Sequence, residues 1–230
     1  MDAYAISGAL AGMSLFAGVD GDALYLISKR AREINVCKNE QLFAKGEAVA
    51  GFYFLLEGKV KLAFLSSRGT EKIVEIVGPG GSFGESMVLA DQPWPFYGQA
   101  IRDSKLLLID RHAFLELLDG QGELKQHLLD RMSRRICELF AHMEALCLQS
   151  SKERVVGYLL REIEQSRSRG NEDHVVELPD TKANTASLLN LTPETFSRII
   201  HTLEREQVIE VSCRSVKILD LSKLQQGCGC

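Results

Sequence analysis

Short apolar runs separated by turn residues dominate the first half of the chain. Four runs are each bounded by Gly, Pro, Asp or Ser: QLFAKGE (41–47), FYFLLEGKVKLAFL (52–65), EKIVEIV (71–77) and KLLLID (105–110). Apolar runs of this length, with turn signals about every ten residues, are typical of antiparallel strands. We predict that residues 20 to about 110 form short strands of an antiparallel roll, with Gly58 in the turn of a hairpin that SSRG (66–69) ends.

The pattern changes to helical spacing after residue 110. RHAFLELLD (111–119) predicts a short helix, and residues 123–150 contain no Gly or Pro. In this second stretch apolar residues recur in steps of three and four, at Leu129, Met132, Ile136, Leu139, Met143 and Leu146. The spacing is that of a coiled-coil seam, which a helix of about 40 Å cannot bury locally. We predict a parallel dimerisation helix; the alternative is a helix packed on its own domain.

The other face of this helix is polar, which favours the dimer. We expect these side chains to face solvent: Arg131, Arg134, Arg135, Glu138, His142 and Glu144.

The last third of the chain has the pattern of a helix-turn-helix. A helix is predicted from Ser151, which can cap it, and a short strand follows in GNEDHVVELP. Ala186 is small where two helices would cross, and Asn190 suits a left-handed turn between them. Thr192 is predicted to cap the second helix, with Pro193 at its first position.

Polar residues at the start of this second helix point away from its apolar stripe. The predicted DNA-reading set is Thr192, Glu194, Thr195, Ser197 and Arg198. Arg can donate two hydrogen bonds to guanine, and Glu can accept one from cytosine. The strand-like runs VIEVS and SVKILD follow, with Cys213 and Arg214 between them as a wing. We predict a winged helix that reads DNA; the alternative is a helical hairpin with a solvated charged face.

Composition limits the remaining possibilities. The chain has 230 residues, a net charge of −4 and 25% charged residues of balanced sign, which argues against a disordered tail or a broadly basic coat. Residues 151–230 carry 11 Lys+Arg against 12 Asp+Glu, so phosphate contacts should come from a local patch. Candidates for that patch are Lys152, Arg154, Lys182, Arg198, Arg214 and Lys217. No run suits a membrane span or a secretory signal, so we expect a cytoplasmic protein without membrane contact.

Cysteine spacing and motif content argue against an enzyme or a metal centre. The cysteines are scattered, with no CxxC pair: Cys37, Cys137, Cys147, Cys213, Cys228 and Cys230. An iron–sulfur cluster normally needs four clustered thiolates, so none is expected. No GxSxG, P-loop, HExxH or dinucleotide-binding fingerprint is present. Two other classes fit the pattern less well: a ligand-binding module without DNA function, and a structural protein.

The order of these segments resembles a family of bacterial transcription factors. LFAKGE with FYFLLEGKVKL, GPGGSFGES and LNLTPETFSRIIHTLE look like the first roll strands, the phosphate-binding cassette and the recognition helix of the cyclic-AMP receptor protein/fumarate–nitrate reduction regulator (CRP/FNR) family. The resemblance implies an α+β protein with a β-roll sensory domain (1–120), a dimerisation helix (121–150) and a winged helix-turn-helix (151–230). It also implies a homodimer that activates transcription together with RNA polymerase.

Details of the recognition helix and cassette place the chain within the family. Glu194, Ser197 and Arg198 are similar to the fumarate–nitrate type, which implies a TTGAT half-site in a palindrome with four central bases. The resemblance implies an effector pocket at Gly84, Glu85, Ser86, Phe96 and Tyr97. Where the cyclic-AMP receptor type has Arg-Ser, the chain has Pro95 and Phe96. No Arg remains to hold a phosphate, so cyclic AMP is not the expected effector.

The branch that the chain most resembles is that of the dissimilatory nitrate respiration regulators (DNR). FYFLLEGKVKL, EKIVEIV and LTPETFSRIIH carry this likeness. It implies control of denitrification genes through nitric oxide and bound heme, for which Met13 is the candidate axial ligand. The alternative is a thiol switch at Cys37, Cys137 or Cys147.

Overall fold

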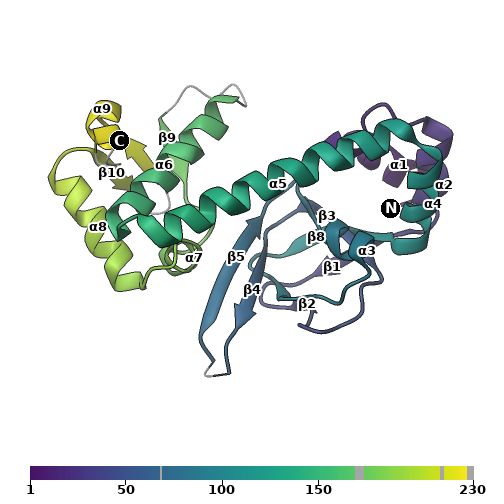
Figure 1. Ribbon diagram of the computed structural model, residues 1–230, viewed down its shortest axis with the longest axis horizontal. Helices are drawn as coiled ribbons and strands as arrows, with labels where there is room; N and C mark the ends of the chain where they lie inside the picture. Colours follow the sequence, from purple (N-terminus) through teal and green to yellow (C-terminus); the bar gives the residue numbers. More distant parts are fainter. Residues whose placement is uncertain (68, 169–173, 213–214, 227–230) are drawn as a thin grey trace. The chain divides into compact units, whose positions relative to one another are not determined.

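The computed structural model describes residues 1–67, 69–168, 174–212 and 215–226 (Figure 1). Internal contacts divide the chain into two units, Met1–Glu138 and Leu139–Cys230, and each unit is described by itself. The boundary falls inside the long helix α5 (Gly122–Leu148), so the first part of that helix belongs to the roll and the rest to the second unit. No helix in the described ranges is long and apolar enough to cross a membrane.

Two four-stranded antiparallel sheets form the roll of the first unit. One sheet has the order β1-β8-β3-β6, and the other has the order β2-β7-β4-β5. The first contains β1 (Ala31–Val36), β8 (Ser104–Asp110), β3 (Gly51–Glu57) and β6 (Ser82–Phe83). The second contains β2 (Gln41–Phe43), β7 (Tyr97–Ala100), β4 (Val60–Leu65) and β5 (Glu71–Val77). Their apolar faces enclose a common core whose central residues include Phe52, Leu55, Leu106 and Ile109.

Gly58 does not form the predicted hairpin. It joins β3 to β4, which lie in different sheets, so those two strands are not partners. The backbone at Gly58 has φ of 90°, and a side chain there would collide with the backbone of Asp103. The real hairpin is β4–β5, in which Val60 pairs with Val77 and Leu65 with Glu71, so its turn is at SSRG.

Helices cover parts of the first unit that were predicted as strands or left open. The N-terminal residues form α1 (Ala3–Ala11), a 3-10 turn η1 (Ser14–Phe16) and α2 (Gly21–Ser28). A fourth segment, α3 (Glu85–Ala90), interrupts the strands after the cassette glycine. The prediction that strands begin at residue 20 was therefore wrong. Helix α4 (Arg111–Gly120) forms as predicted and lies with α1 and α2 at one end of the roll (Figure 1).

The second unit has the predicted winged-helix elements. Helix α6 (Ser151–Ser168) leads to β9 (Val175–Glu177), then to α7 (Lys182–Leu188) and α8 (Pro193–Arg205). Strands β10 (Ile209–Ser212) and β11 (Ser215–Ile218) pair antiparallel, with β9 on the other side of β11, and α9 (Leu221–Gln226) follows. Cys213 and Arg214 of the predicted wing lie outside the described residues.

A capping box starts α6, one residue earlier than predicted. The Glu153 amide donates to the Ser150 hydroxyl at 3.3 Å, and the Ser150 amide donates to the Glu153 carboxylate at 2.6 Å. Ser150, not Ser151, therefore caps this helix. Hydrogen bonds from the Ser150 amide, and then from the Ser150 hydroxyl, to the Glu153 carboxylate hold its pKa below the usual value.

Candidate DNA-binding and effector sites

The turn between α7 and α8 has the geometry predicted for a helix-turn-helix. Asn190 adopts φ of 58°, and the Leu191 amide donates to the Ala186 carbonyl at 2.9 Å, which closes the end of α7. Ala186 is fully buried where the two helices meet. The small side chain and the left-handed Asn together fix how α8 leaves α7.

Helix α8 begins with the predicted cap. The Thr195 amide donates to the Thr192 hydroxyl at 3.2 Å, and Pro193 occupies the first turn. The Glu194 carboxylate accepts from its own backbone amide and from the Thr192 hydroxyl, which lowers the pKa of Glu194. The acid is thus ionised and held at the positive end of the helix.

The apolar stripe of α8 orients its polar residues outward. Phe196, Ile200 and Leu203 are buried in the core of the second unit. Glu194 and Arg198 are exposed, and Thr195 and Ser197 are half-buried. Among the described residues, the Arg198 guanidinium has no ion-pair partner, so it is free to bind a ligand. All five predicted DNA-reading residues lie at the cap or in the first two turns of α8, and Thr192, Glu194 and Arg198 are the exposed ones.

The predicted phosphate patch is only partly available. Lys152 lies 3.6 Å from Glu206, so part of its charge is compensated within the unit. Arg154 donates to the Asn190 carbonyl at 3.5 Å, and its Nε is buried without an acceptor in the described part of the chain. Lys182 is half-buried and Lys217 is exposed. Lys217, on the wing strand β11, is therefore a better candidate than Lys152 for a phosphate contact.

The predicted effector residues differ in exposure and in the groups that they contact. Ser86 is exposed, whereas Glu85 is only 4% exposed, directly after the left-handed Gly84. Phe96 packs in an aromatic cluster with Phe43, Phe64 and Trp94, in which the Phe43 and Trp94 rings stack at 3.8 Å. The interior beneath the cassette is thus filled with rings.

Tyr97 belongs to a separate polar group on the second sheet. Its hydroxyl donates to the Glu71 carboxylate, to which the Lys61 ammonium also donates at 2.5 Å. Burial, and then the hydrogen bond to Glu71, raise the pKa of Tyr97 above its usual value. Lys61 is nearly buried, and Glu71 compensates its charge.

Two arginines predicted to face solvent instead face the roll. Arg131 Nη2 donates to the Ser82 carbonyl at 3.1 Å and lies 3.4 Å from Glu85 Oε1. The same Glu85 oxygen accepts a short hydrogen bond from the Ser82 hydroxyl. The expectation that no Arg reaches the cassette was therefore wrong, because the cation comes from a helix far along the chain. This cation is already paired with the protein's own carboxylate.

Arg135 makes the second contact between α5 and the roll. Its Nη2 lies 2.5 Å from Glu75 Oε2 on β5, and its Nη1 donates to Glu138 at 3.2 Å. Burial raises the pKa of Glu75, and the nearby carboxylates of Glu85 and Glu138 add to this effect, whereas Arg135 opposes it. The ion pair that connects α5 to β5 therefore contains a carboxylate, that of Glu75, that is partly removed from water.

The predicted heme ligand lies in the core of the roll. Met13 is 4% exposed and packs among apolar side chains, so its sulfur would have to leave the core to bind a heme. Within the described ranges no cluster of His, Cys, Asp and Glu could hold a metal ion. A cavity of about 370 Å³ between α2 and α4 is lined by residues such as Ala23, Ile27 and Ala113, without His or Met.

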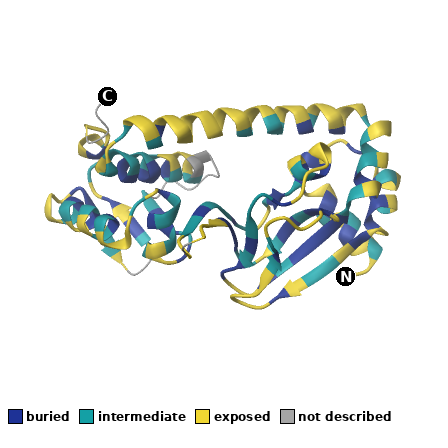
Figure 2. Cartoon of the chain, turned by 60° about the horizontal axis from the view of Figure 1, so that its bottom comes forward, coloured by how far each residue is buried: buried dark blue, intermediate teal, exposed yellow. Residues whose placement is uncertain are grey.

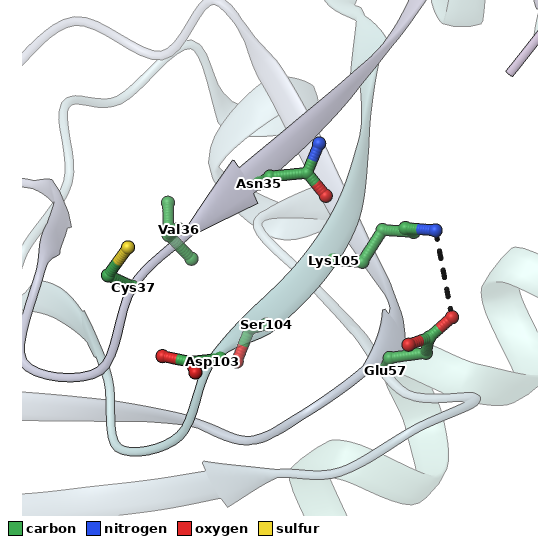
Figure 3. Close-up of a pocket in the computed structure, with 7 residues that line it drawn as sticks. All are labelled: Asn35, Val36, Cys37, Glu57, Asp103, Ser104 and Lys105. Atoms are coloured by element: carbon green, nitrogen blue, oxygen red, sulfur yellow. Dashed lines mark ion pairs between the residues drawn. The ribbon is translucent and has the colours of Figure 1, made fainter.

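A second cavity, of about 280 Å³, lies beside Cys37 (Figure 3). Asp103, Ser104 and Lys105 line it, with the Lys105 ammonium 3.7 Å from Glu57. Cys37, Cys137 and Cys147 are exposed free thiols. Neither cavity contains a residue of the predicted effector set.

The coiled-coil seam of α5 is largely open. Much of the helix is exposed in Figure 2. The exposed large apolar residues before its end are Leu129, Ile136, Leu139, Phe140 and Met143. Met132 instead packs against the roll core, and Leu146 is half-buried. Phe140 was missed, because it lies one residue outside the predicted steps of three and four.

Comparisons with known proteins support this architecture. Residues 33–121 match the model of the cyclic nucleotide-binding domain, and residues 153–226 match that of the Crp-like helix-turn-helix domain. The chain is similar to the transcriptional regulator SdrP of Thermus thermophilus, with 30% identity over 76% of this chain and 82% of SdrP. It is 24% identical to a CRP-like cAMP-activated global transcriptional regulator of Mycobacterium tuberculosis, over 94% of this chain and 96% of that protein.

A solved structure gives the same result. The crystal structure of DNR from Pseudomonas aeruginosa is 32% identical, with a TM-score of 0.50 over 94% of this chain and 95% of that one. Roll, long helix and winged helix together define an α+β transcription regulator that binds DNA and is not an enzyme. The chain belongs to the CRP/FNR family, and its likeness to DNR fits the predicted branch.

Proposed function

We propose that the protein is a homodimeric activator that binds a palindrome of the form TTGAT, four bases, ATCAA. The observation that carries this proposal is the polar surface at the start of α8, where Glu194 and Arg198 are exposed beside the Thr192 cap. A helix N-terminus carrying these residues is what a helix-turn-helix presents to the major groove. Arg198 would donate to guanine, and Glu194 would accept from cytosine or orient the Arg.

A palindrome requires two copies, and α5 supplies the surface for the second. Exposed large apolar side chains gathered in one stripe of a helix are unusual for a monomer and suit a second identical helix. At 100° per residue, Leu129, Ile136, Leu139, Phe140 and Met143 fall within an arc of about 100°. Such a stripe is wide enough for a two-stranded interface.

Control through the roll would use a signal other than cyclic AMP. Pro95 and Phe96 stand where the cyclic-AMP receptor type has a phosphate-holding pair, and Arg131, which reaches the cassette, is bound to Glu85. Heme with nitric oxide stays a prediction from the likeness to DNR, and the core packing of Met13 favours a different axial ligand. The exposed thiols of Cys37, Cys137 and Cys147 are the alternative sensor.

Arg198→Ala tests the proposed reading of DNA. Affinity for the palindrome should fall by about 1–3 kcal/mol per half-site, and the preference for the matched base pair should relax. Lys217→Ala is the matched control, because loss of a phosphate contact weakens matched and mismatched DNA about equally. Fluorescence anisotropy at fixed salt measures both. An unchanged ratio of matched to mismatched affinity for Arg198→Ala would show that α8 does not read the bases.

A further inference from the structure

Two arginines, one helical turn apart on α5, connect this helix to two separate elements of the roll. Arg131 contacts Glu85 at the start of α3, at 3.4 Å, and the Ser82 carbonyl, at 3.1 Å. Arg135 contacts Glu75 on β5 at 2.5 Å. All four charged groups lie in the first unit.

We propose that the pairs Arg131–Glu85 and Arg135–Glu75 form an ionic latch that fixes the rotation of α5 about its own axis. Rotation decides which face of the helix a second copy meets, so the latch sets the register of the dimer without a small molecule. The inference rests on the proposed function, because the rotation of α5 matters to DNA binding only in a dimer.

Helix α5 carries two overlapping seams, and its rotation decides which of them a second copy contacts. Both contain Leu129, Ile136 and Met143. The seam predicted from apolar spacing adds Met132, Leu139 and Leu146, whereas a seam turned by about 50° adds Ser133, Phe140 and Cys147. In the structure Met132 packs on the roll core and Phe140 is exposed, so the helix presents the second seam more fully.

The latch holds against the roll the face of α5 that is adjacent to the first seam. Part of the first seam therefore faces the roll and not a second copy. Arg131 and Arg135 lie on the same face as Leu124 and Leu128, which are buried in the roll. At 100° per residue this face is about 130° from the centre of the second seam. Apolar burial alone leaves some freedom of rotation, because it is not directional. Arg135 donates a hydrogen bond to Glu75, and Arg131 donates one to the Ser82 carbonyl beside its ion pair with Glu85; these contacts, one turn apart, are directional and restrict the rotation.

Because Glu85 and Glu75 are partly or fully buried, the latch fixes the rotation of α5 more than it adds to the free energy of unfolding. Glu85 is almost fully buried, so it depends on Arg131 and the Ser82 hydroxyl for compensation. Taking Glu75 out of water offsets much of its attraction to Arg135. In some proteins, buried ion pairs select one arrangement among several of similar energy, and the latch assigns that role to these two pairs.

Charge exchange at Arg135 and Glu75 tests the latch. We expect Arg135→Glu and Glu75→Arg each to weaken binding to the palindrome at least about tenfold, at fixed ionic strength. The double exchange should restore binding to within about threefold of wild type, because the ion pair is re-formed with reversed polarity. Arg134→Glu is the matched control, since it makes the same change in charge on the same helix at an exposed position and should cost less than about threefold.

Cross-linking reports the rotation directly. In a cysteine-free background, Phe140→Cys should form an intermolecular disulfide faster than Leu139→Cys, and adding Arg135→Glu should abolish this preference. Two results would overturn the latch but not the dimer. One is a double exchange that binds the palindrome no better than either single change, and the other is an Arg134→Glu variant that loses as much affinity as Arg135→Glu. A wild type that is monomeric by light scattering would overturn the proposed dimer as well.

Discussion

The open apolar stripe of α5 predicts how strongly two charges should disrupt the dimer. Ile136 is 53% exposed and Leu139 is 51% exposed in the single chain. Full burial of such a side chain gives about 1.5–3 kcal/mol, so covering the exposed half gives about 1 kcal/mol each. Replacing both by Asp removes four such side chains per dimer, or about 4 kcal/mol, before the cost of burying four carboxylates is added.

Light scattering over a concentration series measures the outcome. A loss of about 4 kcal/mol or more raises the dissociation constant at least about 1000-fold. We therefore expect Ile136→Asp/Leu139→Asp to be monomeric at concentrations where the wild type is dimeric. Leu148→Asp is the control, because Leu148 is 78% exposed but lies outside the stripe, and this variant should remain dimeric. A full dimer of the double variant, folded by circular dichroism, would refute the assignment of this interface.

Three further predictions concern the cap, the buried acid and the cofactor. Thr192→Ala should lower the free energy of unfolding by about 0.5–2 kcal/mol, and Thr192→Ser should retain most of it in chemical denaturation. The pKa of Glu75, which faces Arg131, Arg135, Glu85 and Glu138, is raised in the folded state, so its stabilising contribution is present at low pH and is lost as pH rises through that pKa. Glu75→Gln should therefore gain stability relative to wild type as pH rises, and a pH-independent difference would contradict this. If the protein binds heme, protein purified from heme-replete cells should show a Soret absorption band, and Met13→Leu should leave that band unchanged. The lack of any such band would exclude heme as the cofactor.

Local signals were sufficient to predict the elements that depend on local chemistry. The cap at Thr192, the left-handed Asn190 and the unbroken helix from residue 123 each depend on residues within one or two turns. Their physical causes, which are hydrogen bonds to free amides, tolerance of positive φ and the lack of Gly and Pro, are visible in the sequence. These parts of the fold and of the DNA-binding surface could therefore be predicted residue by residue.

Features that depend on distant partners could not be predicted in this way. Gly58 looks like a hairpin turn, but the partners of β3 and β4 lie far along the chain in two different sheets. Arg131 and Arg135 look solvent-exposed because the acids that bind them are 46 and 60 residues earlier. Phe140 looks like a residue beside the seam until the rotation of α5 is known. The effector region was least predictable, because its charges come from both the roll and the helix.

Binding of the wild-type protein to one DNA duplex tests the central claim most directly. A duplex with TTGAT, four bases and ATCAA is titrated at physiological salt beside a duplex with one half-site scrambled. We predict two chains per intact palindrome and an affinity that falls at least about 100-fold when one half-site is scrambled, since each mismatched base pair costs about 1–3 kcal/mol. Equal affinity for both duplexes, or one chain bound per palindrome, would contradict a dimer that reads this sequence.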